Sequence, residues 1–196
     1  LVIFCSARRM QRFFPDFESL DRFTFSLDSF DERVLCPHCA KPNQLISHGV
    51  IYKQRSMTTR EPVGKRVFCS NRYQRTGCGR TVQLYVASVS PAMQYAVAAV
   101  FAFLSALLMN VSVSAAYQTA TGRSDARQAW RWLRKLACRL TEFRSFVHAR
   151  LGHVALLVKA RSRRLQLLLP AVAALFSSLP PDPCAHYQWM QQKPLF

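Results

Sequence analysis

The sequence predicts an α+β protein in which a small β-sheet unit precedes an all-α helical unit. Short alternating apolar runs lie between residues 45 and 86, and a long stretch without charged residues follows Pro91. An amphipathic helical pattern then begins near residue 125. A chain of 196 residues allows one or two domains and excludes a large multidomain enzyme.

Residues 1–33 hold recurring phenylalanines among six acids. We expect them to be an N-terminal extension that adds a strand or a helix to the sheet unit, or that binds a partner. Their charge differs from that of the rest of the chain, in which basic residues dominate.

The basic residues lie in two blocks. The whole chain has 27 Lys and Arg against 10 Asp and Glu, for a formal net charge of +17, which predicts an anionic partner, nucleic acid first. Residues 34–90 contain nine basic residues and one acid, and residues 123–164 contain twelve basic residues and two acids. Residues 91–122 have no charge. Two basic blocks around an apolar one indicate two binding modules joined by a buried element.

Four of the seven cysteines have the spacing of metal ligands. Cys36-Pro37-His38-Cys39 is a C-x2-C pair, and Cys69 and Cys78 form a second pair. No signal-peptide pattern is present at the first residues, so we expect a reducing cytoplasm, where clustered cysteines bind metal rather than form disulfides. Between the pairs, we expect short strands bounded by Gly49, Pro62 and Gly64. Residues 34–90 are therefore predicted to form a zinc ribbon with a closed, structural Zn2+ site.

The second cysteine pair is irregular because eight residues separate its members. We interpret 70–76 as an insertion that bulges out before Gly77 restores the turn. His38 and His48 are competing ligands, so a site with one histidine, or no metal site, remains an alternative.

The apolar stretch 92–111 has two interpretations. Its twenty residues have the length of a membrane span. Pro91 suits the first turn of an ordinary helix, and a helix that is apolar all round is also typical of the centre of a small helical domain. We favour the buried helix.

A helix-turn-helix is predicted after this stretch, within a helical domain over 91–140. A short segment at 111–120 ends at Thr121-Gly122, and Ser124-Asp125 can start a helix from about Asp125. We expect its packed face to contain Ala126, Ala129, Trp130, Leu133, Leu136, Ala137 and Leu140. The residues expected to contact DNA are Arg123, Arg127, Gln128, Arg131, Arg134 and Lys135, with Arg139 as a further phosphate contact. The alternative is a solvated basic face on a structural helix.

Two further segments complete the chain. Residues 141–179 are expected to form one or two C-terminal helices, with an apolar run broken at Pro170, that cap the core or form a dimer surface. Residues 180–196 are expected to form an extended tail.

The motifs resemble a known family. Cys36-Pro37-His38-Cys39, His48-Gly49, 64–69, Gly77-Cys78-Gly79-Arg80-Thr81 and a helix-turn-helix ending at 130–136 are similar to the zinc ribbon plus helix-turn-helix of insertion-sequence proteins. The resemblance covers about residues 34–140. In that family the two modules lie at the N-terminus of transposases or form a small regulator of transposition.

The resemblance and the residues together predict a zinc-dependent DNA-binding protein of a mobile genetic element, without a catalytic domain of its own. The acids after residue 90 are Asp125, Glu142 and Asp182, which do not look like a catalytic carboxylate triad. The expected partners are double-stranded DNA, a separate transposase subunit and a second copy of the chain. The alternatives are a membrane-anchored zinc-ribbon protein with a span near 92–111 and a truncated transposase.

Overall fold

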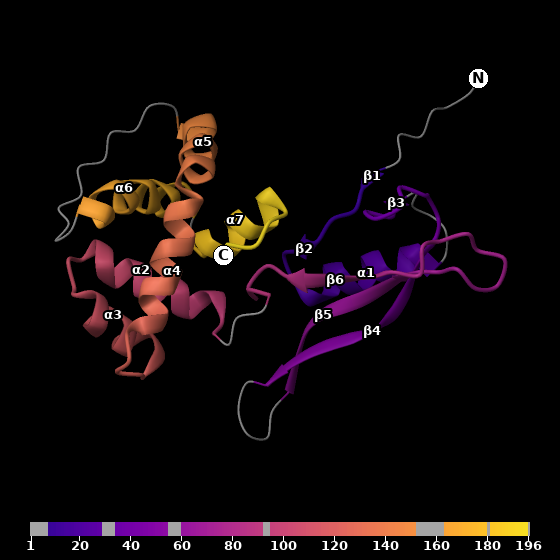
Figure 1. Cartoon of the computed structure of the whole chain (residues 1–196), viewed down its shortest axis with the longest axis horizontal. Helices are drawn as coiled ribbons and strands as arrows, with labels where there is room; N and C mark the ends of the chain where they lie inside the picture. Colours follow the sequence, from indigo (N-terminus) through magenta and orange to yellow (C-terminus); the bar gives the residue numbers. More distant parts are fainter. Residues whose placement is uncertain are drawn as a thin grey trace. The chain divides into compact units, whose positions relative to one another are not determined.

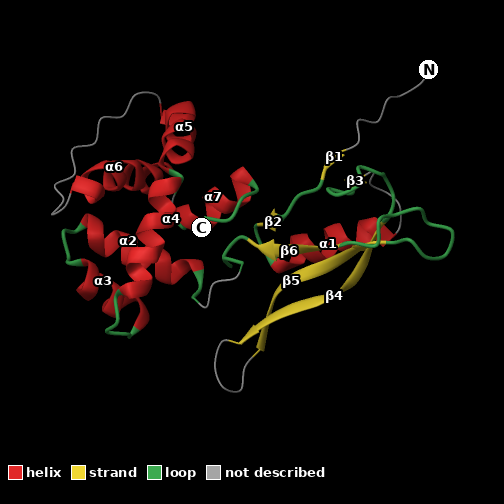
Figure 2. Cartoon of the chain, in the orientation of Figure 1, coloured by secondary structure: helices red, strands yellow, loops and turns green. Residues whose placement is uncertain are grey.

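The chain divides into two compact units, Leu1–Val89 and Ser90–Phe196 (Figure 1). The computed structural model describes residues 8–28, 34–54, 60–91, 95–151, 163–179 and 181–195. The first unit is a small sheet with one helix, and the second unit is helical in its described part (Figure 2). The predicted mixture of α and β structure is therefore confirmed.

A four-stranded sheet forms the centre of the first unit. The strands β4 (Leu45–Gln54), β5 (Arg60–Cys69) and β6 (Thr81–Val86) are antiparallel neighbours. The short strand β2 (Phe13–Phe14) pairs in parallel with β6, so the order is β2-β6-β5-β4. A separate parallel pair joins β1 (Arg8–Arg9) to β3 (Val34–Leu35). Alternating apolar residues face the core from β5 and β6, as the period of a strand requires.

The three residues expected to bound strands lie inside them. Gly49, with φ of 132°, follows a register shift within β4, where the strand has one extra residue. Gly64 pairs with Tyr85, and a Cβ atom there would lie 2.3 Å from the Leu84 carbonyl oxygen, so β5 and β6 approach too closely for a side chain. Pro62 pairs with β4 but lies beyond the last β6 pair, where its missing N–H costs less.

The described part of residues 1–33 adds both a strand and a helix to the sheet unit, as expected: β2 and the helix α1 (Phe17–Asp28) belong to the first unit. Asp16 caps α1 by accepting a hydrogen bond of 2.7 Å from the Ser19 N–H. The helix buries Leu20, Thr24 and Leu27 on its inner face. The Lys65 ammonium of β5 donates to the Thr24 hydroxyl at 2.9 Å and fixes the helix to the sheet.

The second unit packs its helices around one core. They are α2 (Val97–Leu108), α3 (Val113–Thr121), α4 (Arg127–Cys138), α5 (Leu140–Leu151), α6 (Arg163–Ser178) and α7 (Pro183–Gln191). Buried side chains from all six helices form a single apolar cluster. The expected boundary near residue 140 is therefore not a break between domains.

The apolar helix α2 is shorter than the stretch that predicted it. It has 12 residues, whereas a membrane span needs about 20. Its side chains Val97, Val100 and Phe103 are fully buried among the other helices. In the described ranges no single helix is long and apolar enough to cross a membrane, although the bent pair α6 and α7 passes that test by length and composition.

Two expectations for the C-terminal part are wrong. Pro170 lies inside α6 and does not break it. The tail expected to be extended contains α7, because Asp182 and Pro183 provide a helix start. The Asp182 carboxylate accepts a hydrogen bond of 3.1 Å from the Ala185 N–H, and Tyr187 is fully buried. The apolar residues of this segment are used in the core.

Candidate metal centre and cationic helix

The first cysteine turn (36–41) follows β3. The Ala40 N–H donates to the Cys36 carbonyl at 2.9 Å, and the Cys36 N–H donates to the Lys41 carbonyl at 3.1 Å. The His38 N–H points at the Cys36 sulfur, at 3.4 Å. Ala40 has a left-handed φ of 57°. These contacts place the Cys36 and Cys39 sulfurs on the same side of the turn.

The second cysteine turn (69, 70 and 77–80) repeats the two backbone hydrogen bonds of the first turn, but its N–H···S contact comes from the second cysteine and not from the residue before it. The Gly79 N–H donates to the Cys69 carbonyl at 2.9 Å, and the Cys69 N–H donates to the Arg80 carbonyl at 2.9 Å. The Cys78 N–H points at the Cys69 sulfur, at 3.2 Å. Gly79 has a φ of 72°, in the same left-handed region as its counterpart in the first turn.

The repeat is possible because the chain between Cys69 and Cys78 loops out. The Gly77 N–H donates to the Ser70 carbonyl at 2.8 Å, so these two residues take the places that Pro37 and His38 have in the first turn. The inserted loop is 71–76, and Ser70, expected to be part of the insertion, belongs to the turn. A Cβ atom at Gly77 would lie 2.2 Å from the Ser70 oxygen, which explains the need for glycine.

The four sulfurs fit a tetrahedral ion. The Cys36 and Cys78 sulfurs lie 3.8 Å apart, as do those of Cys39 and Cys69, and all four lie within 4.8 Å of one another. A regular tetrahedron with metal–sulfur bonds of about 2.3 Å has edges of about 3.8 Å. The predicted four-cysteine cluster is therefore present and could hold a metal ion.

The thiols differ in their readiness to ionise. The hydrogen bond from the Lys41 backbone N–H lowers the pKa of Cys39 to about 7. Burial raises the pKa of Cys69 to about 12. Metals bind thiolates, so an ion in this cluster would displace the Cys69 proton.

The two competing histidines lie outside this cluster. His38 and His48 are exposed, and the ring of His48 packs against Phe68 with centroids 5.6 Å apart. In the part of the chain that the structure describes, the four cysteines form the one group of three or more potential ligands within reach of one ion. Four protein ligands leave no open position for chemistry on the metal.

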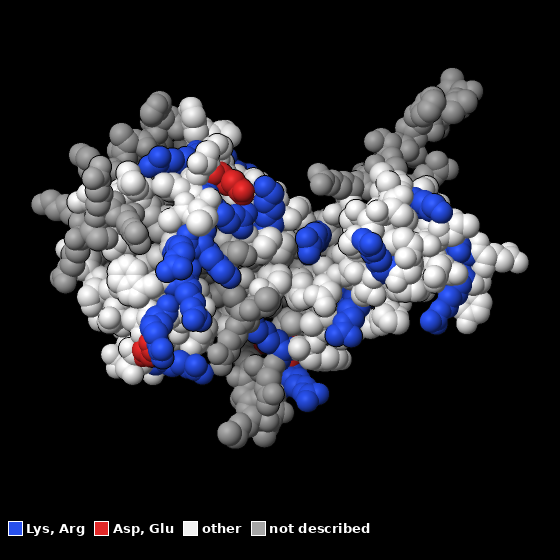
Figure 3. All heavy atoms as spheres, in the orientation of Figure 1, with Lys and Arg blue, Asp and Glu red and all other residues white. Residues whose placement is uncertain are grey.

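The cationic residues predicted on α4 share one exposed face. Arg127, Arg131, Arg134 and Lys135 are exposed and Gln128 is partly buried. Figure 3 shows Lys and Arg side chains gathered along α4. Gln128 accepts a hydrogen bond of 3.4 Å from the Arg131 guanidinium.

Asp125 is the acid beside this face, and its ion pair with Arg127, at 2.7 Å, holds the pKa of the carboxyl below its usual value. A hollow of about 280 Å³ at the start of α4 brings together four of the predicted DNA contacts. They are Arg123, Arg127, Gln128 and Arg131. Arg134 and Lys135 lie further along the helix.

The packed face of α4 contains Trp132 in place of the expected Trp130. Trp132 is 1% exposed, whereas Trp130 is 48% exposed. The Trp132 ring makes T-shaped contacts with the rings of Tyr95, Phe103 and Tyr117, with centroids 5.4 to 5.6 Å apart. Edge-to-face contacts of this kind stabilise an aromatic cluster beyond the area that they bury. The cluster fixes the rotation of α4 about its axis.

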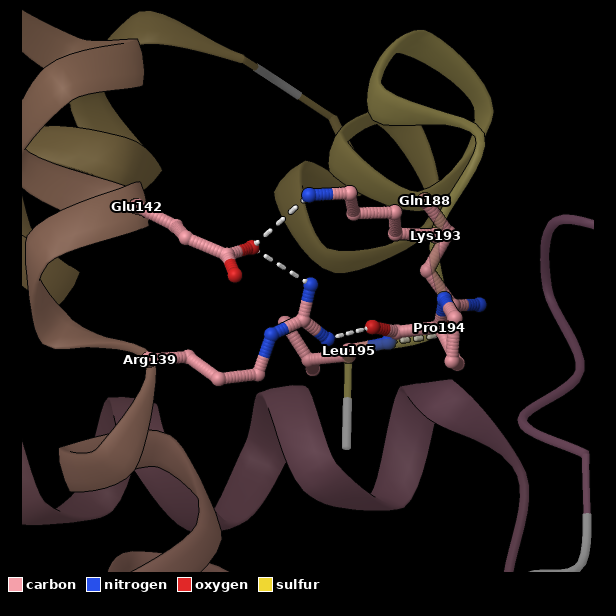
Figure 4. Close-up of polar contacts among 6 residues, drawn as sticks. All are labelled: Arg139, Glu142, Gln188, Lys193, Pro194 and Leu195. Carbon is pink, nitrogen blue, oxygen red and sulfur yellow. Dashed lines mark hydrogen bonds and ion pairs between the residues drawn. The ribbon is translucent and has the colours of Figure 1, made fainter.

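The exposed part of α4 differs from the expectation in two further ways. Ala137 is exposed, although it was expected on the packed face. Arg139 is not placed to contact phosphate, because its side chain is only 17% exposed. Figure 4 shows its guanidinium donating to the Pro194 carbonyl and to the Glu142 carboxylate. The distance from the guanidinium nitrogen to the Glu142 oxygen is 2.9 Å. It joins α5 to the end of the chain.

Comparisons with protein-family models, curated proteins and solved structures find no significant match. Fold and site therefore define the class: a mixed α/β chain with a four-cysteine cluster that could hold a metal ion. No sequence motif indicates the residues that anchor the inserted loop. Lys41 and Gln44 lie outside any motif and reach the loop only in the folded chain.

Proposed function

We propose that this chain is a zinc-dependent DNA-binding protein in which α3, the turn after it and α4 act as a helix-turn-helix. The observation that best supports this proposal is the exposed cationic face of α4. The opposite face of the helix is buried in the core through Trp132, Leu133 and Leu136. A rigid helix with one packed face can present its other face to the major groove.

The turn before α4 supports this role. Helix α3 ends at Gly122, which has a left-handed φ of 71° and caps the helix through a hydrogen bond of 2.7 Å to the Gln118 carbonyl. Five residues, 122–126, connect the helices. In the proposal, Arg131 and Gln128 read base edges while Arg123 and Lys135 bind phosphates.

The charges nearby also favour an anionic partner. Residues 90–196 contain three acids. Glu142 is paired with Arg139, and Asp182 caps α7. Only Asp125 lies beside the cationic face, where it pairs with Arg127. The remaining positive charge of α4 has no described acid to neutralise it.

Zinc is the proposed metal because four thiolates at tetrahedral spacing suit it. When bound, the ion would join the two cysteine turns and supply folding free energy to the first unit. Thiolate ligands persist in a reducing compartment, so the proposal includes a cytoplasmic location. The association with a mobile element and a transposase subunit rests on the resemblance of the motifs.

The test is DNA binding by the zinc-loaded chain, with a site selected from random duplexes and affinities measured over a salt series. We expect a log–log salt slope steeper than about −4, because each neutralised phosphate contributes about −0.9. Arg131→Ala should lower affinity for the selected site by about 1–3 kcal/mol.

Arg144→Ala is the matched control, because it removes an exposed arginine from α5 in the same unit. Its effect on the selected site should be small. If Arg131→Ala and Arg134→Ala bind both the selected site and random duplexes as tightly as the wild type does, the proposed role of α4 is refuted.

A further inference from the structure

The loop 71–76, inserted in the second cysteine turn, is held firmly at its base. The Lys41 ammonium donates to the Thr76 carbonyl at 2.6 Å, and the Thr76 N–H donates to the Gln44 side-chain oxygen at 2.9 Å. The Arg75 guanidinium donates to the Asn43 carbonyl at 3.3 Å. These contacts join the loop to the segment that follows the first cysteine turn, so its tip has a fixed direction.

The tip is a tight turn with a large aromatic residue at an unfavourable position. The Arg75 N–H donates to the Arg72 carbonyl at 3.1 Å, and the residues between them, Tyr73 and Gln74, have φ of 52° and 66°. Such turns usually contain Gly, Asn or Asp, because other side chains are strained at positive φ. Tyr73 is 93% exposed, so its ring gains almost no packing energy within the chain.

Basic residues lie near Tyr73 in the sequence and at the base of its loop. Arg72, next to Tyr73, and Arg80, in the second cysteine turn, are exposed. Lys41 lies at the base of the loop, where it bonds the Thr76 carbonyl. The one acid of residues 34–90, Glu61, lies at the other end of β5, opposite Lys53. The loop and the two cysteine turns therefore contain basic residues and no acid, and the loop presents a flat aromatic ring.

We propose that the loop 71–76 binds an unpaired DNA base, with Tyr73 stacked on the base and Arg72 and Arg80 on the neighbouring phosphates. Exposed aromatic rings beside cations are the means by which proteins hold single strands. Within a duplex, the neighbouring bases cover each base face, so the loop selects an overhang or another unpaired segment. This inference rests on the proposed function for its partner, DNA, but uses different residues from α4.

The test compares a blunt duplex that carries the selected site with the same duplex extended by a short single-stranded overhang. Fluorescence anisotropy with the zinc-loaded full chain measures both affinities. We expect the wild type to favour the overhang by about 10-fold, the effect of one stacked base. Tyr73→Ala should remove this preference and leave the blunt-duplex affinity unchanged, whereas Tyr73→Phe should keep it. Tyr52→Ala, which removes a 57% exposed tyrosine from β4, is the matched control.

A second variant separates binding from stability. Tyr73→Asn should raise the thermal unfolding temperature, because Asn tolerates positive φ, and should still lose the preference. A preference retained by Tyr73→Ala, or absent from a wild type that binds the blunt duplex, would overturn the inference and leave α4 as the DNA-reading helix. A wild type that binds neither DNA would overturn both proposals.

Discussion

Gly77→Ala should weaken metal binding, because Gly77 lies where the second cysteine turn closes over its inserted loop. A Cβ atom there would lie 2.2 Å from the Ser70 oxygen and 2.7 Å from the Cys69 sulfur. Ordinary van der Waals contact begins near about 3.4 Å. The two sides of the turn must therefore separate by about 1 Å, which breaks the hydrogen bond between them and moves the Cys69 sulfur off the tetrahedron.

The expected loss is 10- to 100-fold in zinc affinity, the usual effect of disturbing the groups that orient metal ligands, which corresponds to about 1.4–2.7 kcal/mol. Competition against a chromogenic chelator measures it. Ala40→Gly is the control, because Ala40 has a φ of 57° in the first turn and glycine tolerates that conformation without crowding. Its zinc affinity should stay within about twofold.

A Gly77→Ala chain with wild-type zinc affinity would contradict this prediction, because it would show that the crowding is relieved without moving the ligands.

Deletion of 71–76 gives an independent test of the same geometry. It should leave a regular C-x2-C turn that still binds one zinc ion per chain, because Ser70 and Gly77 are already hydrogen-bonded neighbours. Loss of zinc from this variant would contradict the equivalence of the two turns.

Further predictions concern the second unit. Leu136→Ala should destabilise it by about 2–5 kcal/mol in thermal unfolding, because it leaves a cavity in the core, whereas Trp130→Ala should cost about 1 kcal/mol or less. Asp182→Ala should cost about 1 kcal/mol through loss of the α7 cap, measured in the same way. In DNA titrations Lys135→Ala should reduce the salt slope by about 1, whereas Arg139→Ala should leave the slope unchanged and lower the unfolding temperature; equal slopes for the two variants would contradict these roles.

The metal ligands and the approximate positions of the strands could be predicted because their signals are local, although the bounds of β4 and β5 could not. A C-x2-C pair needs only a tight turn, and short apolar runs lie in each of β4, β5 and β6. The start of α4 was also predictable within two residues, since Asp125 precedes it. Gly77 could be interpreted as a turn residue beside Cys78 before its crowding was known.

The remaining features depend on contacts between distant segments. Trp130 and Trp132 lie on the two flanks of the apolar arc of α4, and only the partners Tyr95, Phe103 and Tyr117 determine which of them is buried. The end of the inserted loop likewise depends on Gln44, more than twenty residues before it. Periodicity within one helix carries neither kind of information.

The parallel pairing of β2 with β6 has a consequence for the order in which the first unit folds. Phe13 pairs with Tyr85, so this pairing must close a loop that contains nearly the whole unit. The entropy lost on closure grows with loop length, which slows non-local pairing. A metal ion bound by Cys36 and Cys78 would shorten the path between these strands before they meet. During synthesis β2 and α1 precede β6, so a bound ion would be expected to speed the docking of these early segments onto the sheet.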